Sequence, residues 1–64
     1  MRSNLKSARH KKRLTQLELA NMLKISDRYY QAIESGIRKG DVCLWVSLSE
    51  ILAEPIKYLL HDDK

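Results

Sequence analysis

The chain has 64 residues, of which 31% are charged and 44% hydrophobic, and a formal net charge of +4. A chain this short forms one small core, because it buries only about 60% of the surface that it exposes when unfolded. We therefore expect one domain over residues 1–64. The single cysteine excludes an internal disulfide and the apolar stretches are too short to cross a bilayer, so we expect the protein to be in a reducing cytoplasm.

Basic side chains are concentrated in the first forty residues. Residues 1–40 contain ten basic and three acidic residues, a net charge of +7, whereas residues 41–64 contain two basic and five acidic residues, a net charge of −3. A basic region attracts a polyanion, although Lys and Arg are also common on ordinary solvated helices. We therefore expect any polyanionic partner to bind the first forty residues.

Capping signals and apolar spacing predict five helices and no strand. The predicted helices cover residues 4–12, 16–23, 27–35, 42–53 and 55–60. Thr15 and Glu18 form the capping-box pattern at the start of the second helix. Ser26 caps the third helix, Gly36 ends it, and Asp41 caps the fourth. The second and third helices therefore follow each other after a short turn, which holds them at a fixed angle.

Two charged residues lie on helix faces that should be buried. Arg9 follows Leu5 by four residues on the first helix, and Glu34 follows Tyr30 by four residues on the third. A half-buried charge is tolerated when it is paired, which predicts a salt bridge between Arg9 and Glu34. The alternative is that both side chains reach water separately. Tyr30, if buried, also needs a partner for its hydroxyl, which the sequence does not name.

The segment LTQLELANMLKISDRYYQAIESGIRKGD, residues 14–41, resembles the helix-turn-helix of the Cro and phage-repressor family, the XRE-type regulators. The matching features are the Leu-Thr-Gln opening, Leu-Ala in the second helix, Ile-Ser at the turn, and Ile-Glu before a glycine and a basic loop. The resemblance extends over nearly the whole chain. It implies a compact, all-α, five-helix, lambda-repressor-like DNA-binding domain whose second and third helices form the helix-turn-helix.

The same resemblance implies roles for individual residues. In that family the second helix crosses the DNA backbone and the third enters the major groove, which is wide enough for one helix. Carried over by position, the base contacts fall on Asp27, Arg28 and Gln31, with Ala32 at the edge. Arg28 suits guanine, Gln31 adenine and Asp27 cytosine, although an acid at a helix start also simply stabilises the helix dipole. The implied phosphate contacts are Gln16, Tyr29, Arg38 and Lys39. The alternative for Tyr29 is that its ring contacts a thymine methyl group.

Two positions depart from the family pattern. Lys24 stands where glycine is usual in the turn. A left-handed backbone retained there costs about 1 kcal/mol, and the alternative is a slightly rearranged turn. Gly40 stands where proline is common. We therefore expect the loop that carries Arg38 and Lys39 to be looser until DNA orders it.

The fourth helix is more apolar than one buried face requires. The residues assigned to the core are Val42, Trp45, Leu48 and Leu52. The apolar residues left for a second surface are Cys43, Leu44 and Ile51. Family members commonly dimerise through the fourth helix and the fifth, which here starts at Pro55, and this implies a homodimer whose recognition helices are about 34 Å apart. The alternative is that a small fold simply exposes some apolar residues.

These features favour a sequence-specific transcriptional regulator, a repressor of phage, plasmid or bacterial origin that binds double-stranded DNA as a homodimer. The alternative is an antitoxin or another protein-interaction module on the same scaffold, regulated by or holding a partner protein through its fourth helix. An enzyme is disfavoured, because His10 and His61 are far apart in sequence and lie beside no nucleophile or set of metal ligands. We expect no metal, cofactor or small-molecule ligand.

Overall fold

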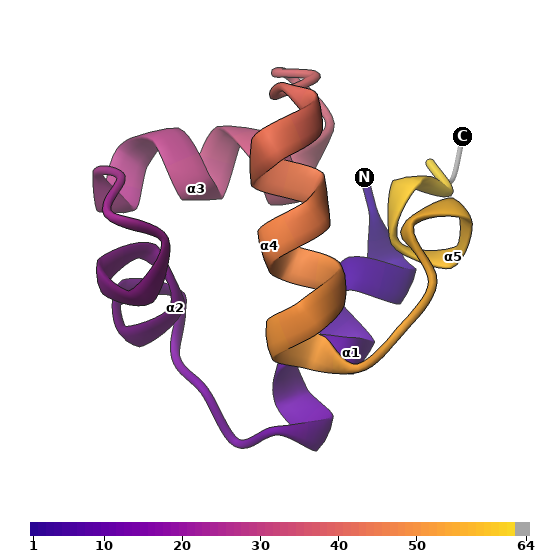
Figure 1. Ribbon diagram of the computed structural model, residues 1–64. Helices are drawn as coiled ribbons and strands as arrows, with labels where there is room; N and C mark the ends of the chain where they lie inside the picture. Colours follow the sequence, from indigo (N-terminus) through magenta and orange to yellow (C-terminus); the bar gives the residue numbers. More distant parts are fainter. Residues whose placement is uncertain (63–64) are drawn as a thin grey trace.

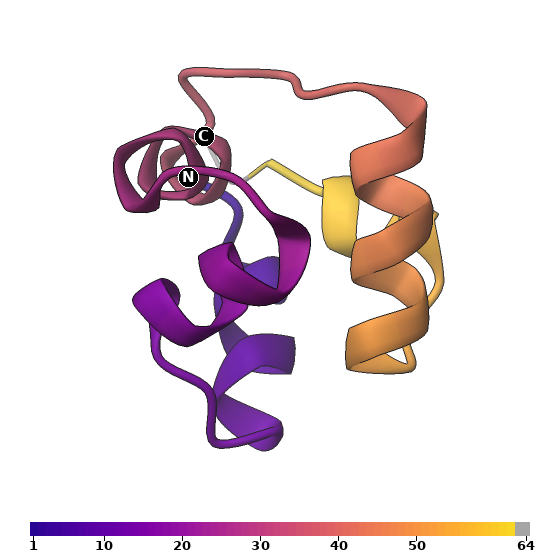
Figure 2. The ribbon, with the colours of Figure 1, turned by 60° about the vertical axis from the view of Figure 1, so that its left-hand side comes forward.

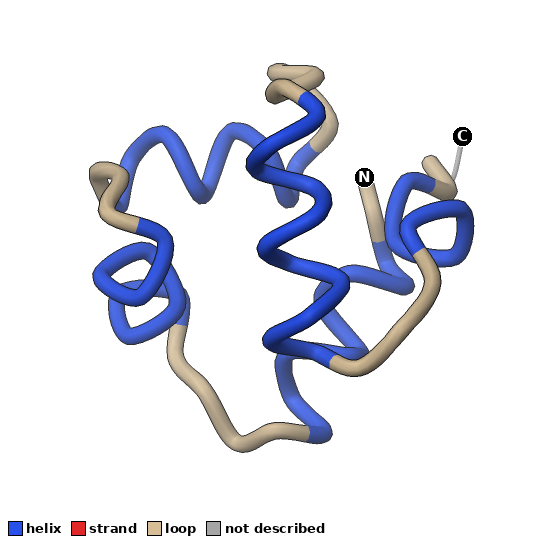
Figure 3. Tube along the Cα trace, in the orientation of Figure 1, coloured by secondary structure: helices blue, strands red, loops and turns tan. Residues whose placement is uncertain are grey.

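Five helices account for most of the computed structural model, which describes residues 1–62; Asp63 and Lys64, the end of the predicted domain, lie outside the described residues. The helices are α1 (Ser3–Lys11), α2 (Gln16–Leu23), α3 (Asp27–Ser35), α4 (Val42–Leu52) and α5 (Ile56–Leu60). Residues 1–62 contain no strand (Figure 3), so the predicted all-α fold is confirmed. Pro55, predicted as the first residue of the fifth helix, is its N-cap instead, because its ψ of 144° is extended.

The helices pack around one core. α3 lies across one end of the molecule beside α2, α4 runs along the front, and α1 and α5 pack against each other (Figure 1). The loop between α3 and α4 spans the top of the molecule in Figure 2. None of the helices within residues 1–62 combines the length and the hydropathy that a membrane span requires. The buried apolar residues are Leu5, Ala8, Leu19, Ala20, Tyr30, Ile33, Leu44, Trp45, Leu48, Leu52 and Leu59.

The predicted caps of α2 and α3 are present. The Thr15 hydroxyl accepts a hydrogen bond from the Glu18 amide at 3.0 Å, and the Glu18 carboxylate accepts one from the Thr15 amide at 2.9 Å. The Ser26 hydroxyl accepts from the Tyr29 amide at 3.0 Å, and Gly36 ends α3 with a φ of +92°. Local hydrogen bonds therefore set the starts of both α2 and α3.

Lys24 has the left-handed conformation, with a φ of +59°, at the position where the family pattern has glycine. We expect Lys24→Gly to raise the free energy of unfolding by about 1 kcal/mol, because glycine adopts this φ without a Cβ penalty. Chemical denaturation measures the change. Lys12→Gly is the matched control, because Lys12 also ends a helix but has a φ of −86°. An equal gain in both variants would contradict the proposed strain at Lys24.

The orientation of α4 corrects the prediction for its two faces. Leu44, predicted to lie at an interface, is 8% exposed and belongs to the core, whereas Val42, predicted for the core, is 77% exposed. Leu44 lies four residues before the buried Leu48 and shares its stripe, while Val42 is about 200° around the helix from Leu44. Ile51 is half-buried against the core, so Cys43 is the one exposed member of the predicted interface set.

Candidate nucleic-acid interface

Arg9 and Glu34 form the predicted salt bridge, which joins α1 to α3. The Arg9 guanidinium donates from Nε to Glu34 Oε2 at 2.9 Å and from Nη2 to Oε1 at 3.2 Å, and the two side chains are 8% and 4% exposed. Arg9 Nη1 also donates to the carbonyl oxygen of Leu14 at 2.8 Å, just before α2 begins. One guanidinium therefore holds α1, the approach to α2 and α3 in fixed relative positions.

Two more side chains bind the Glu34 carboxylate. The Tyr30 hydroxyl donates to Oε2 at 2.7 Å, which identifies the partner that a buried tyrosine needs. Burial raises the pKa of Tyr30, and its hydrogen bond to Glu34 raises it further, so the hydroxyl remains a donor. Gln16 donates from Nε2 to Oε1 at 3.2 Å, so this residue, expected to contact phosphate, is also tied to α3.

We expect the Glu34 carboxylate to make the fold sensitive to acid. Burial by itself raises its pKa, but the hydrogen bonds from Arg9 and Tyr30 and the Arg9 charge together lower that pKa below its ordinary value of 4.5. A group whose pKa is lowered by folding contributes its full stability above the unfolded pKa and loses it as the pH falls through the folded pKa. We expect the free energy of unfolding to fall more steeply below pH 4.5 in the wild type than in Glu34→Gln.

Chemical denaturation at a series of pH values from neutral to about 3 measures this difference. Glu50→Gln is the control, because Glu50 is an exposed glutamate on α4. It should keep the wild-type pH dependence. If Glu34→Gln and Glu50→Gln have the same pH dependence, the Glu34 carboxylate does not carry the acid sensitivity.

The exposed face of α3 carries the residues expected to contact bases. Arg28 and Gln31 are exposed, and Ala32 is half-buried beside them. Gln31 donates from Nε2 to Asp27 Oδ2 at 3.0 Å, one helical turn earlier. This bond orients the Gln31 amide and leaves its oxygen and its second N–H available for another partner. Asp27 therefore has a structural partner on its own helix.

A shallow groove connects this face to the start of α2. Its lining residues are Gln16, Arg28, Gln31, Ala32, Ser35 and Ile37. The fold thus brings Gln16 together with three of the four residues expected to contact bases. Because the capping box satisfies the amides of Thr15 and Glu18, the amides of Gln16 and Leu17 remain without an intrahelical partner. The positive end of α2 therefore favours an anion at the edge of the groove.

Three residues at this surface were not predicted from the sequence. Ser35 and Ile37 line the groove, and Lys6 of α1 lines an adjoining depression together with Gln16 and Gln31. Ile37 is 78% exposed. Its position directly before the basic residues Arg38 and Lys39 was a signal in the sequence that could have identified it. No local pattern identifies Lys6, because only the packing of α1 against α3 brings it here.

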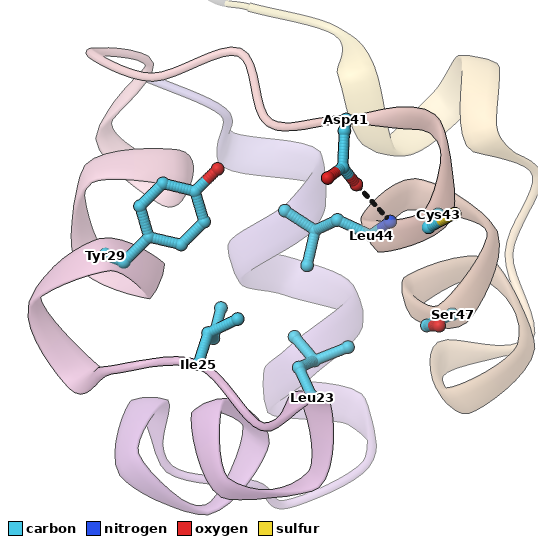
Figure 4. A pocket seen from close by; sticks show the side chains of 7 residues that line it. All are labelled: Leu23, Ile25, Tyr29, Asp41, Cys43, Leu44 and Ser47. Atoms are coloured by element: carbon cyan, nitrogen blue, oxygen red, sulfur yellow. Dashed lines mark hydrogen bonds between the residues drawn. The ribbon is translucent and has the colours of Figure 1, made fainter.

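The other expected phosphate contacts lie outside the groove. Arg38 and Lys39 are exposed on the loop after α3, and within residues 1–62 neither of these side chains forms an ion pair. Tyr29 instead lines a hollow of about 220 Å3 between the turn before α3 and the start of α4 (Figure 4). The hollow is lined by Leu23, Ile25, Tyr29, Asp41, Cys43, Leu44 and Ser47. The structure therefore separates Tyr29 from the groove.

Two capped helices joined by a tight turn, with a polar face on the second helix and a basic loop after it, define a helix-turn-helix domain. A family model described as a helix-turn-helix domain matches residues 3–62, and the chain belongs to this family. The chain is 40% identical over 60 residues to an uncharacterized HTH-type transcriptional regulator, YqaE, of Bacillus subtilis (strain 168). The aligned region covers 94% of this chain and 52% of that curated relative, so the chain spans about half the relative's length. No solved structure shows a significant match.

Proposed function

We propose that the chain is a sequence-specific, non-enzymatic DNA-binding domain of a transcriptional regulator, which acts as a repressor at an operator in the cytoplasm. The observation that carries this proposal is the groove that unites Gln16, at the N-terminus of α2, with Arg28 and Gln31 on α3. Arg28 matches the two acceptors of guanine in the major groove, and Gln31 matches the acceptor and donor of adenine. Membership of the helix-turn-helix family and the likeness to a transcriptional regulator support the same function.

The proposed docking places α3 in the major groove and the start of α2 against the DNA backbone. Gln16 and the amides at the start of α2 then bind one phosphate group. Arg38 and Lys39, on the loop after α3, bind further phosphates, and Lys6 adds positive charge beside the groove. These contacts set affinity and its salt dependence, whereas the exposed side chains of α3 select the sequence.

Selection of a randomised duplex library on the purified protein, followed by sequencing of the retained DNA, tests this function. Enrichment of one motif supports sequence-specific binding. An inverted repeat with half-sites about one helical turn apart supports a two-fold dimer as well. Retention without enrichment that disappears as salt increases would refute sequence-specific binding, because it is the behaviour of purely electrostatic contacts.

We further propose that the protein binds DNA as a homodimer through the outer face of α4. Its exposed apolar residues there are Val42, Cys43 and Val46, which replace the predicted set that included Leu44 and Ile51. Val42 is 77% and Val46 43% exposed, and the two lie one helical turn apart. Burial of these side chains against a second copy removes apolar surface from water.

Val46→Asp is expected to shift the protein to monomer in sedimentation experiments and to abolish preference for an inverted repeat, because it places a charge in the apolar contact. Met22→Asp is the matched control, since Met22 is an exposed apolar residue (53%) on α2 and not on α4. The same exposed apolar face of α4 would also suit the alternative function, an antitoxin or another protein-interaction module that binds a different protein. A monomeric wild type that binds a protein partner through Val46 would support that alternative.

A further inference from the structure

Arg2 is a buried cation that has no acidic partner among residues 1–62. It is 6% exposed, and within residues 1–62 its side chain forms no ion pair. Its guanidinium instead lies over the ring of Trp45, with 5.2 Å from Cζ to the ring centroid, and Nη1 donates to the carbonyl oxygens of Ile33 and Arg38, the latter at 2.8 Å. Burying a charge is unfavourable unless other contacts compensate for the lost water. Here the compensating contacts are the hydrogen bonds to the two carbonyls and the face of the Trp45 ring.

The same contacts hold the basic loop from the inside. Arg2 binds the carbonyl of Arg38, and Trp45 donates from Nε1 to the carbonyl of Lys39 at 2.7 Å. The backbone amide of Arg2 also donates to the carbonyl of Glu34 at 2.8 Å, at the end of α3. Two successive carbonyls of the loop therefore face the protein interior, while the side chains of Arg38 and Lys39 are exposed.

Gly40 allows the loop to lie this close to Trp45. Its φ is +71°, and a Cβ there would lie 2.8 Å from Leu44 Cδ2 and 3.2 Å from Trp45 Nε1. Proline, which is common at this position in the family, fixes φ near −65° and could not adopt this conformation. The glycine that suggested a looser loop is therefore the residue that lets the loop be anchored.

We propose that Arg2 and Trp45 together form a clamp that holds the Arg38–Lys39 loop in its phosphate-binding conformation before DNA arrives. Arg2 is then a positioning residue and not a DNA contact, because its side chain is buried and its Nη1 donates to two protein carbonyls. A loop ordered in advance loses less conformational entropy on binding, which increases affinity without a new contact. The proposal rests on the proposed DNA-binding function, but the state of the loop in the free protein can be tested independently.

Amide hydrogen exchange of the free protein tests the clamp without DNA. The Arg38 amide donates to the carbonyl of Ala32 at 3.2 Å, and the Leu19 amide in α2 donates to Thr15 at 3.0 Å. In Arg2→Met, which keeps an apolar stem on Trp45, we expect protection of the Arg38 amide to fall about tenfold and that of Leu19 to remain. Trp45→Phe keeps an aromatic ring in the core and the net charge but removes the indole donor, and it should have the same effect. Unchanged protection at Arg38, or an equal loss at both amides, would overturn the clamp.

Binding of a mixed-sequence DNA duplex tests its functional consequence. We expect Arg2→Met and Trp45→Phe to bind this DNA about tenfold more weakly than the wild type. A loss of this size is expected if about one further backbone residue must become ordered when the DNA binds. In an Arg38→Ala/Lys39→Ala background, Arg2→Met should change affinity less than about twofold, because the loop has lost the groups that the clamp positions. Equal losses in both backgrounds would show that Arg2 acts through general stability and would overturn the proposal. A wild type that binds no DNA would refute the proposed function, while the exchange result would still decide whether the clamp exists.

Discussion

Arg9→Met is expected to lower the free energy of unfolding by about 3–5 kcal/mol, the loss typical of removing one partner from a buried ion pair. The variant leaves the Glu34 carboxylate, whose side chain is 4% exposed, without its guanidinium donors, while Met keeps most of the apolar stem. It also removes the bond from Arg9 Nη1 to the carbonyl of Leu14. Urea denaturation followed by circular dichroism measures the change.

Lys6→Met is the matched control for this prediction. Lys6 lies on the same helix and is exposed, so the same substitution there should change the free energy of unfolding by less than about 0.5 kcal/mol. Arg9→Met/Glu34→Met should be more stable than Arg9→Met, because no buried charge is left unpaired. A loss below about 1 kcal/mol in Arg9→Met, or no recovery in the double variant, would contradict the role of the pair.

Arg28→Ala is expected to weaken binding to a selected operator by about 1–3 kcal/mol and to relax the preference at one base pair. The physical reason is that a bidentate contact to guanine discriminates among bases, which phosphate contacts do not. Affinity for mixed-sequence DNA should change much less. Competition binding against operators with each base pair replaced in turn measures both quantities.

Arg38→Ala is the comparison variant, since it removes one exposed arginine from the loop and none from α3. It should weaken all sequences alike and lower the slope of log affinity against log salt by about one. Equal effects of Arg28→Ala and Arg38→Ala on specific and mixed-sequence DNA would contradict the division between base and phosphate contacts.

Local signals in the sequence determined the helices and the turn between α2 and α3. The capping box of Thr15 and Glu18 and the cap at Ser26 depend on residues three positions apart, so they can be identified without the fold. The Arg9–Glu34 salt bridge could also be predicted from the sequence, because each residue is a charged side chain on an otherwise apolar helix face and the two charges have opposite signs. The family resemblance added the expected docking of α3, which the sequence pattern alone does not imply.

Only the tertiary structure decided which surfaces meet. Because α4 is apolar on several sides, its sequence does not show which face is buried. Packing against α2 and α5 buries Leu44 and leaves Val42 exposed, which is the reverse of the prediction. Likewise, nothing in the sequence near Arg2 indicates that its guanidinium lies over Trp45, 43 positions later, or binds the loop after α3. Caps and turns depend on residues that are close together in the chain, so they could be predicted from this sequence. Burial and long-range hydrogen bonds depend on how the helices pack in space, so they could not.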